Sequence, residues 1–216
     1  MRIQSSQQLA DWIRSGETRA LCGQRIFVHT AVTPGRPPLL LIHGYPTASY
    51  DWIRIWPRLA ARHSLYTLDL LGFDLSDKPR RSRYPIEQQA DLCTALLGEF
   101  RVGAAHVLAH DYGDTVAQEL LARHAEGRLQ VASVAFLNGG LFPETHRARP
   151  IQKLLAIPVL GPLFARAMNY EKFAAAMLSI SGRHPPSREE LQDLWLLLER
   201  NEGRQAMARL ISYMEQ

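Results

Sequence analysis

Over its first 137 residues the chain alternates short apolar runs with longer segments of helical periodicity. The run from Leu39 to Ile42 is apolar without a break, which is typical of a strand buried on both faces of a parallel sheet. Strands are predicted over residues 25–32, 39–42, 64–70, 104–109 and 131–137, the last one also buried, and helices over residues 51–62, 86–100 and 112–124. Strands that alternate with helices predict the α/β class, with a mostly parallel sheet flanked by helices.

The pattern changes after Phe142, because the remaining sequence contains helical patterns and no convincing strand. Helices are predicted over residues 151–157, 171–179, 188–200 and 204–214. In the third of these, one apolar stripe is expected to pack inward. The stripe consists of Leu191, Leu194, Trp195 and Leu198. We therefore expect two units, a sheet-containing core over residues 1–142 and a helical cap over residues 143–216.

Composition and charge exclude several classes of protein. With 46% hydrophobic and 21% charged residues, the chain is typical of a globular protein rather than a disordered one. The tight basic run of Arg80, Arg81 and Arg83 is too small for a nucleic-acid surface. The two cysteines are far apart and lack Cys-x-x-Cys spacing, which excludes a disulfide scaffold and a cysteine zinc site. No nucleotide-binding motif occurs, so no cofactor is predicted.

Membrane insertion is not expected from the sequence. No apolar run approaches the roughly 18 residues of a spanning helix. The best candidate, Leu154 to Ala165, is interrupted by Pro158 and Pro162. The first residues also lack the apolar centre of a signal peptide, and a cytoplasmic location is therefore predicted.

The segment LAHDYG, residues 108–113, joins a predicted strand to a predicted helix. Small residues, Ala109 and Gly113, stand two positions before and two after Asp111. A nucleophile elbow requires this arrangement, because bulky neighbours would clash on a turn that lifts the central side chain clear of the sheet. Asp111 is therefore a candidate nucleophile, at the place where the usual elbow carries Ser. The alternative is that Asp111 acts only as the N-cap of the following helix.

A second turn, HGYPT over residues 43–47, follows the predicted strand at residues 39–42. Gly44 lets the chain turn sharply, so that the N–H of Tyr45 can point into a site. Next to a nucleophile elbow, this N–H and that of Tyr112 would form an oxyanion hole. His43 is expected to be a structural hydrogen-bonding residue of the turn. A plain strand-to-helix turn is the alternative, but it does not account for both motifs in this order.

The segments HGYPTASYDW, LDLLGFDLSDKP and AHDYGDTVAQELL together resemble the α/β-hydrolase superfamily. Within it they resemble the branch of epoxide hydrolases and haloalkane dehalogenases, whose nucleophile is Asp. HDYGDTVAQELL, LNGGLFPETHR and the SDKP loop are similar to segments of the mesoderm-specific transcript protein group. The resemblance extends from about Gln24 to Gln216. It implies an α/β-hydrolase fold with a helical cap, and a cis peptide bond between Tyr45 and Pro46.

The resemblance also implies a mechanism. Asp111 would attack an electrophilic carbon and form an alkyl-enzyme ester, which a His-activated water would hydrolyse. For an epoxide, cap tyrosines would protonate the opening oxygen; Tyr170 and Tyr213 are the candidates, with core packing as their alternative role. Dehalogenases hold the halide with a Trp and an Asn at positions that are Tyr112 and Tyr45 here. The expected substrate is therefore a small apolar electrophile, with an epoxide or ester ahead of an alkyl halide.

The second half of the family's catalytic pattern is missing. The family places its acid and its His after the nucleophile, on loops beyond the last sheet strands. Downstream of Asp111 the histidines are His124, His146 and His184, of which His146, near the start of the predicted cap, is the one substitute base. We therefore expect a sequence truncated before the catalytic His and the last strands. The alternatives are loss of turnover and completion by another polypeptide.

Two further expectations follow from this gap. Missing strands would leave a sheet edge unpaired, and self-association through that edge is therefore expected. A non-catalytic protein that uses the same pocket or the cap surface for binding is the competing class of function.

Two smaller features concern single residues. Asp74 stands where the relatives' loop usually has Gly, so a positive φ at this position would strain the backbone mildly. His106 and His110 are four residues apart on a predicted strand, where four residues span roughly 13 Å. They therefore cannot share one ion, and no metal site is predicted.

Overall fold

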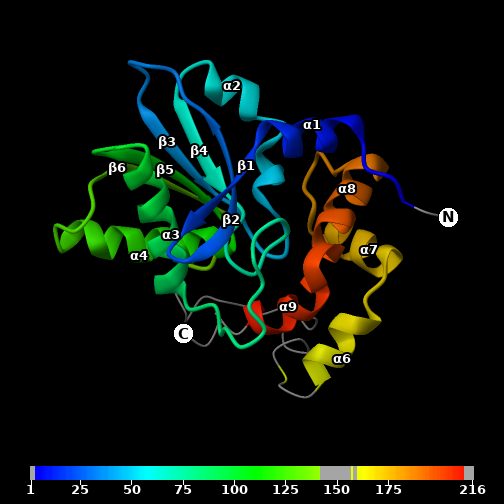
Figure 1. The fold of residues 1–216 in the computed structure, drawn as a ribbon. Coiled ribbons are helices and arrows are strands. Elements are labelled where there is room, and N and C mark those ends of the chain that lie inside the picture. The colour runs from blue at the N-terminus through cyan, green and yellow to red at the C-terminus, as the bar shows by residue number, and fades with distance from the viewer. Residues whose placement is uncertain (1–2, 142–156, 158–159, 212–216) are drawn as a thin grey trace.

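The computed structural model describes residues 3–141, 157 and 160–211. At its centre lies a six-stranded sheet with the strand order β1-β2-β4-β3-β5-β6 (Figure 1). The strands β3 to β6 run parallel, whereas β1 and β2 form an antiparallel pair and β2 is antiparallel to β4. The strands are β1 (Glu17–Leu21), β2 (Gln24–Ala31), β3 (Pro38–Ile42), β4 (Ser64–Leu68), β5 (Ala105–His110) and β6 (Val131–Leu137). The predicted mostly parallel sheet is confirmed.

Helices cover both faces of this sheet. Successive side chains of a strand point to opposite faces, so an unbroken apolar strand has apolar side chains to bury on each face. Leu40 and Ile42 of β3 belong to a core shared with α3 (Ile86–Glu99) and α4 (Tyr112–Ala125). Leu39 and Leu41 belong to a second core, shared with α1 (Gln7–Ser15) and α2 (Trp56–Ala60). Figure 1 shows these two helical layers on opposite sides of the strands. The unbroken apolar run of β3 is therefore explained by burial on both faces.

The N-terminal region differs from the prediction in two places. The elements α1 and β1 precede the first predicted strand; α1 buries only Leu9 and Trp12, too few apolar residues for a clear periodic signal. The helix predicted over residues 51–62 consists of two short pieces, η1 (Ser49–Trp52) and α2. Pro57 lies in the first turn of α2, where its missing N–H leaves no hydrogen bond unmade.

The prediction that the strand at residues 131–137 is buried is wrong. Ala132, Ser133 and Ala135 of β6 are exposed, and Leu137 is 40% exposed. The physical reason is its position, since within the described residues β6 pairs with β5 alone and forms the edge of the sheet. Self-association through this edge stays a prediction, which sedimentation at high protein concentration tests.

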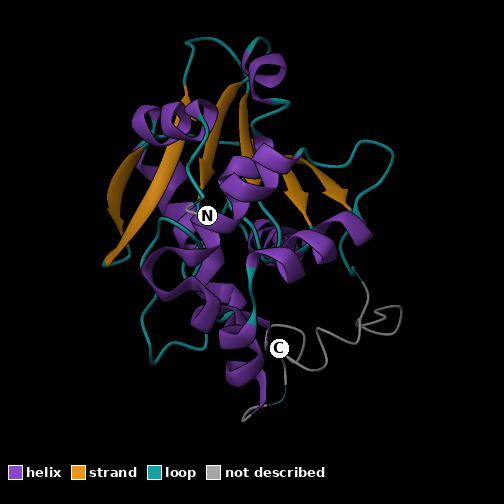
Figure 2. Cartoon of the chain, turned by 90° about the vertical axis from the view of Figure 1, so that its right-hand side faces the viewer, coloured by secondary structure: helices purple, strands orange, loops and turns teal. Residues whose placement is uncertain are grey.

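Among the described residues C-terminal to β6, the regular elements are all helices. They gather at the end of the sheet toward which the parallel strands point (Figure 1, Figure 2). They are α6 (Leu160–Ala167), α7 (Tyr170–Ile180), α8 (Arg188–Glu199), η3 (Arg200–Glu202) and α9 (Gly203–Leu210). The stripe predicted in α8 is confirmed, because Leu191, Trp195 and Leu198 are each buried and Leu194 is partly buried against them.

Other parts of the C-terminal prediction are open or corrected. The helix predicted over residues 151–157 lies outside the described residues except for Ile157, and so do the last residues of the one predicted over 204–214. The proposed division between a core ending at residue 142 and a cap beginning at residue 143 also stays a prediction. Pro162 does not interrupt a helix, because it lies in the first turn of α6, where proline is well accommodated.

One buried carboxyl group, that of Asp193 on α8, joins the C-terminal helices to the rest of the fold. Its two oxygens accept hydrogen bonds from the backbone N–H of Ser6 at 2.8 Å, the hydroxyl of Ser6 at 2.5 Å and the hydroxyl of Tyr50 at 3.1 Å. Asp193 is only 1% exposed. Because Ser6 also caps α1, a single side chain ties α1, η1 and α8 together.

Replacing Asp193 by Ala is therefore expected to lower the free energy of unfolding by about 2–4 kcal/mol, because buried donors of Ser6 and Tyr50 lose their acceptor. Urea unfolding measures the change. The matched control is Asp11→Ala, which removes an exposed ion pair with Arg14 and should change the free energy by less than about 0.5 kcal/mol. Equal small losses in the two variants would contradict this role of Asp193.

Candidate active site

The turn between β5 and α4 holds Asp111 in a backbone conformation that non-glycine residues rarely adopt, with φ at 52° and ψ at −112°. The side chain makes no capping hydrogen bond to α4, so the alternative that Asp111 is merely an N-cap residue does not describe it. Instead, its Oδ1 accepts a hydrogen bond of 2.9 Å from the backbone N–H of Tyr45. The two sequence motifs therefore meet through one hydrogen bond.

Two glycines make this close approach possible. A Cβ atom on Gly113 would lie 2.5 Å from the carbonyl oxygen of Ile42 and 2.8 Å from that of His43. A Cβ atom on Gly44 would lie 2.8 Å from the Cβ of Asp111. All three separations are shorter than atoms in folded proteins tolerate, so each of the two positions requires glycine for steric reasons. The elbow and the 43–47 turn are packed directly against each other.

The 43–47 turn is fixed by hydrogen bonds from its own histidine. The Nδ1 of His43 lies 2.8 Å from the carbonyl oxygen of Gly44, and its Nε2 lies 3.0 Å from the backbone nitrogen of Leu70. His43 is fully buried, and burial lowers the pKa of its imidazole. These contacts suit a neutral ring that donates from Nδ1 and accepts at Nε2. The Tyr45–Pro46 bond is cis, as the resemblance implied.

The aromatic side chain of Phe73 packs against residues of both turns. Its ring centroid lies 4.8 Å from that of His43, 6.5 Å from that of Tyr45 and 5.3 Å from that of Tyr112. Tyr112 is the first residue of α4 and its side chain is fully buried. The contribution of the Tyr112 main chain to an oxyanion hole stays a prediction.

A carboxyl group that the sequence analysis did not single out, Asp69, positions the loops around the site. It follows β4 and is 1% exposed. Its Oδ1 accepts from the backbone N–H and the hydroxyl of Ser49, at 2.9 and 2.6 Å, and its Oδ2 accepts from the N–H of Leu75 at 3.0 Å. Asp69 therefore links the segment after the 43–47 turn to the loop after β4. The strand predicted over residues 64–70 included Asp69, and its partner Ser49 is 20 residues away in the sequence, so no local signal identified it.

Two further carboxyl groups lie close enough to Asp111 for their charges to interact. Burial raises the pKa of Asp51 to about 7, a hydrogen bond from Thr47 opposes this rise, and the charges of Asp111 and Asp69 reinforce it. Burial also raises the pKa of Asp114 to about 6. Both groups therefore keep their protons in the folded chain at pH values where an unfolded chain has lost them.

The sign of the pH dependence follows from these shifts. At Asp51 and Asp114 the folded chain binds more protons than the unfolded chain between about pH 4 and pH 7, so their contribution to stability is complete at low pH and is lost as the pH rises through 6 and 7. Buried histidines act in the opposite direction, because burial lowers the pKa of His29 to about 4 and also lowers that of His43. Relative to the unchanged chain, Asp51→Asn should shift the difference in unfolding free energy between pH 5 and pH 8 by roughly 2 kcal/mol in favour of pH 8, which urea unfolding at the two pH values measures. Asp11→Asn, at an exposed position, should leave this difference unchanged. An Asp51→Asn chain with the same pH difference as the unchanged chain would contradict the assignment.

Of the two tyrosines predicted to lie in the cap, the structure describes only Tyr170. Tyr170 begins α7 and is partly buried against the hydrophobic cluster that contains Phe173 and Trp195. Its hydroxyl donates to the carbonyl oxygen of Arg188 at 3.5 Å. Tyr213 lies outside the described residues. Proton donation by either residue stays a prediction.

Two histidines downstream of Asp111 lie within the described residues, and neither belongs to the elbow. His124 lies near the far end of α4, thirteen residues along, which corresponds to roughly 20 Å of helix. Its ring Nδ1 lies 3.2 Å from the carbonyl oxygen of Leu129. His184 is exposed in the loop before α8, and His146 lies outside the described residues. His124 is therefore too distant to act as the base for Asp111.

Two kinds of feature are absent from the described part of the chain, a metal-ligand cluster and a membrane-spanning helix. Residues 3–141, 157 and 160–211 contain no group of three or more His, Cys, Asp or Glu side chains placed to hold a metal ion. Within the same residues, no helix is both long enough and apolar enough to cross a membrane.

The strand order, the strained turn at Asp111 and the N–H that Tyr45 directs at it are the parts of an α/β-hydrolase core. Residues 37–180 match the family model described as the alpha/beta hydrolase fold. The chain belongs to this family.

Individual proteins of known sequence or structure are similar to this chain over most of its length. The chain is 41% identical to the mesoderm-specific transcript protein of Mus musculus over 223 aligned residues, which cover 99% of this chain and 67% of that protein. It is 38% identical to LipZ of Mycobacterium tuberculosis, over 98% of this chain and 74% of LipZ. Among solved structures, the haloalkane dehalogenase DbeA from Bradyrhizobium elkani superposes with a TM-score of 0.77 at 25% identity, covering 93% of this chain and 69% of that one. The chain thus spans about two thirds of the mouse protein, and the predicted resemblance is confirmed.

Proposed function

We propose that this hydrolase-family chain uses Asp111 as a nucleophile on a small apolar electrophile. The observation that carries the proposal is the hydrogen bond from the Tyr45 N–H to Oδ1 of Asp111. It orients the carboxyl group and assigns the two oxygens different roles. Oδ1 faces a backbone donor that stabilises negative charge, and Oδ2 is the attacking atom.

The reaction proceeds in two steps. In the first, Oδ2 of Asp111 bonds to an electrophilic carbon, and the bond between that carbon and its leaving oxygen breaks; with an epoxide, the released alkoxide takes a proton from an acid. In the second, a base takes a proton from water while the water oxygen adds to the ester carbonyl carbon; the negative charge develops on Oδ1, and the N–H groups of Tyr45 and Tyr112 stabilise it. The bond between the carbonyl carbon and Oδ2 then breaks, the released oxygen takes the proton from the base, and Asp111 is a carboxylate again; from an epoxide the product is a diol.

The substrate class is proposed from the residues around Asp111. Tyr112 and Tyr45 occupy the positions at which the dehalogenase branch carries its halide-binding Trp and Asn. An epoxide or an ester is therefore favoured over an alkyl halide. For an epoxide, Tyr170 and Tyr213 remain the proposed proton donors.

We propose that neither His124 nor His184, the two described histidines downstream of Asp111, is the base for this reaction. The proposal is supported by the distance of His124 from the elbow and by the exposure of His184. Without a base, the chain should complete the first step and accumulate the ester.

Intact-mass measurement after incubation with styrene oxide tests the proposal. The chain should carry a Cys22→Ser substitution, because Cys22 is an exposed thiol that epoxides would alkylate. We expect a stable mass increase of one styrene oxide per chain. A chain that neither gains this mass nor forms the diol would contradict the proposal and favour the non-catalytic binding role.

A further inference from the structure

One end of the molecule combines exposed apolar side chains with an excess of positive charge. In Figure 1, α6, α9 and the loop that leads from β4 into α3 lie together at the end opposite α2. The helices α6 and α9 contact each other. Arg204 of α9 donates hydrogen bonds to the carbonyl oxygens of Arg166 at 3.2 Å and Met168 at 2.9 Å. The two helices therefore present one surface.

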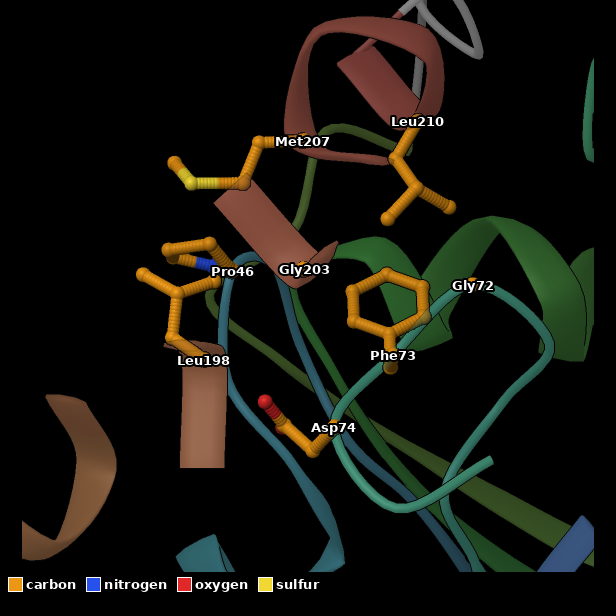
Figure 3. Close-up of a pocket in the computed structure, with 8 residues that line it drawn as sticks. All are labelled: Pro46, Gly72, Phe73, Asp74, Leu198, Gly203, Met207 and Leu210. Carbon is orange, nitrogen blue, oxygen red and sulfur yellow. The ribbon is translucent and has the colours of Figure 1, made fainter. Parts of the chain in front are cut away.

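The loop after β4 belongs to the same surface because it packs on α9. Phe73 of the loop and Met207 of α9 line one small pocket at this contact (Figure 3). Farther along the loop, the guanidinium group of Arg209 donates to the hydroxyl of Tyr84 at 3.2 Å, and it lies 5.7 Å from the centroid of the same ring. The loop and the C-terminal helices are therefore joined along their length.

The loop itself is held at both ends. Asp74 has a φ of 24°, the positive value expected at a position where relatives usually carry Gly, and its carbonyl oxygen accepts from Nζ of Lys78 at 2.5 Å. Asp77 faces β2, where its Oδ2 accepts from the backbone N–H of Arg25 at 2.8 Å. Tyr84 is fully buried at the other end. The arginines between Lys78 and Tyr84 are therefore carried by an anchored loop.

The charges of this surface do not balance. Its two exposed glutamates, Glu199 and Glu202, already pair with Arg204 and Arg80. Four further exposed arginines form no ion pair among the described residues. They are Arg81 and Arg83 in the loop, Arg166 in α6 and Arg200 in η3. The surface therefore carries more positive charge than was evident from the short basic run of the loop alone.

Exposed apolar side chains lie beside these arginines. Leu163 and Phe164 of α6 are 57% and 41% exposed, and Ile157, just before this helix, is 41% exposed. At the start of the neighbouring α7, the opposite charges of Glu171 and Lys172 cancel. Large apolar side chains that gather on an exposed segment are typical of an interaction surface. Apolar side chains flanked by arginines match the surface of an anionic membrane.

We propose that this end of the molecule binds the surface of an anionic phospholipid membrane. Leu163 and Phe164 enter the boundary between headgroups and acyl chains, and the arginines of the loop and η3 contact lipid phosphates. A second copy of the chain does not fit, because two positively charged surfaces repel each other. A nucleic acid would match the charges and leave the apolar side chains in water. The binding requires no chemistry at Asp111.

The test is sedimentation of the full chain with vesicles made of equal parts phosphatidylserine and phosphatidylcholine, and with vesicles of phosphatidylcholine alone. We expect at least about tenfold tighter binding to the anionic vesicles, weakened by added salt. Arg81→Gln combined with Arg83→Gln should weaken this binding about tenfold or more, because each arginine near the surface contributes several-fold. Leu163→Gln combined with Phe164→Gln should weaken it about tenfold, because these side chains no longer enter the apolar layer.

Matched controls are available at α2, at the opposite end of the molecule in Figure 1. Ile55 is 38% exposed, and Arg58 and Arg62 are exposed as well. Ile55→Gln, and Arg58→Gln combined with Arg62→Gln, should bind the anionic vesicles within about twofold of the unchanged chain, because these residues lie far from the membrane. All the substituted side chains are exposed, so the variants should fold, which circular dichroism checks.

Three results would overturn the proposal. They are no binding to the anionic vesicles, equal binding to both kinds of vesicle, and the same effect of the substitutions at α2 as of those at α6 and in the loop. The last result would show a general attraction of a basic chain to negative charge. Because the readout is binding alone, failure of Asp111 as a nucleophile would not produce any of these results.

Discussion

An Asp111→Asn chain is expected to form the styrene oxide adduct at least about a thousandfold more slowly than the chain with Asp111, because an amide oxygen is a poor nucleophile. Both chains carry Cys22→Ser, and initial rates are measured by intact mass. Asn retains an oxygen that can accept the Tyr45 N–H, so the turn should keep its geometry. Comparable adduct rates in the two chains would show that another residue reacts.

The second large effect concerns the fold of the elbow. Gly113→Ala should lower the free energy of unfolding by about 3 kcal/mol or more, because the added Cβ would meet backbone oxygens of Ile42 and His43 that cannot rotate away. Urea unfolding measures this change. The matched control is Gly98→Ala in α3, where a Cβ has nothing within 4 Å and helix propensity should raise stability by up to about 1 kcal/mol. If both substitutions proved neutral, the tight packing of the elbow on β3 would be contradicted.

Much of the sheet could be predicted because its signals are local. Each central strand is a short apolar run between turns, and β2 to β5 lie within a few residues of the predicted ranges. Edge position is not a local property, and the sequence therefore does not reveal that β6 exposes one set of side chains while Val131, Val134 and Phe136 are only partly buried. The short helix α1 was missed because a few buried side chains suffice to dock it.

The two turns that form the centre of the candidate site, at Asp111 and at residues 43–47, could also be predicted. The small residues around Asp111 and the Gly44 turn carry steric requirements that are visible in sequence, and the structure joins them through Tyr45. Asp69 and Phe73 were not singled out. Their contacts join segments separated by twenty or more residues, so nothing in their local sequence distinguishes them from ordinary loop residues.

The most direct test of the account is to locate the styrene oxide adduct within the Cys22→Ser chain by peptide fragmentation mass spectrometry. The account predicts that the added mass lies on Asp111, the residue whose Oδ1 is held by the Tyr45 N–H. An adduct on any other side chain, with the peptide that contains Asp111 unmodified, would contradict the assignment of Asp111 as the nucleophile.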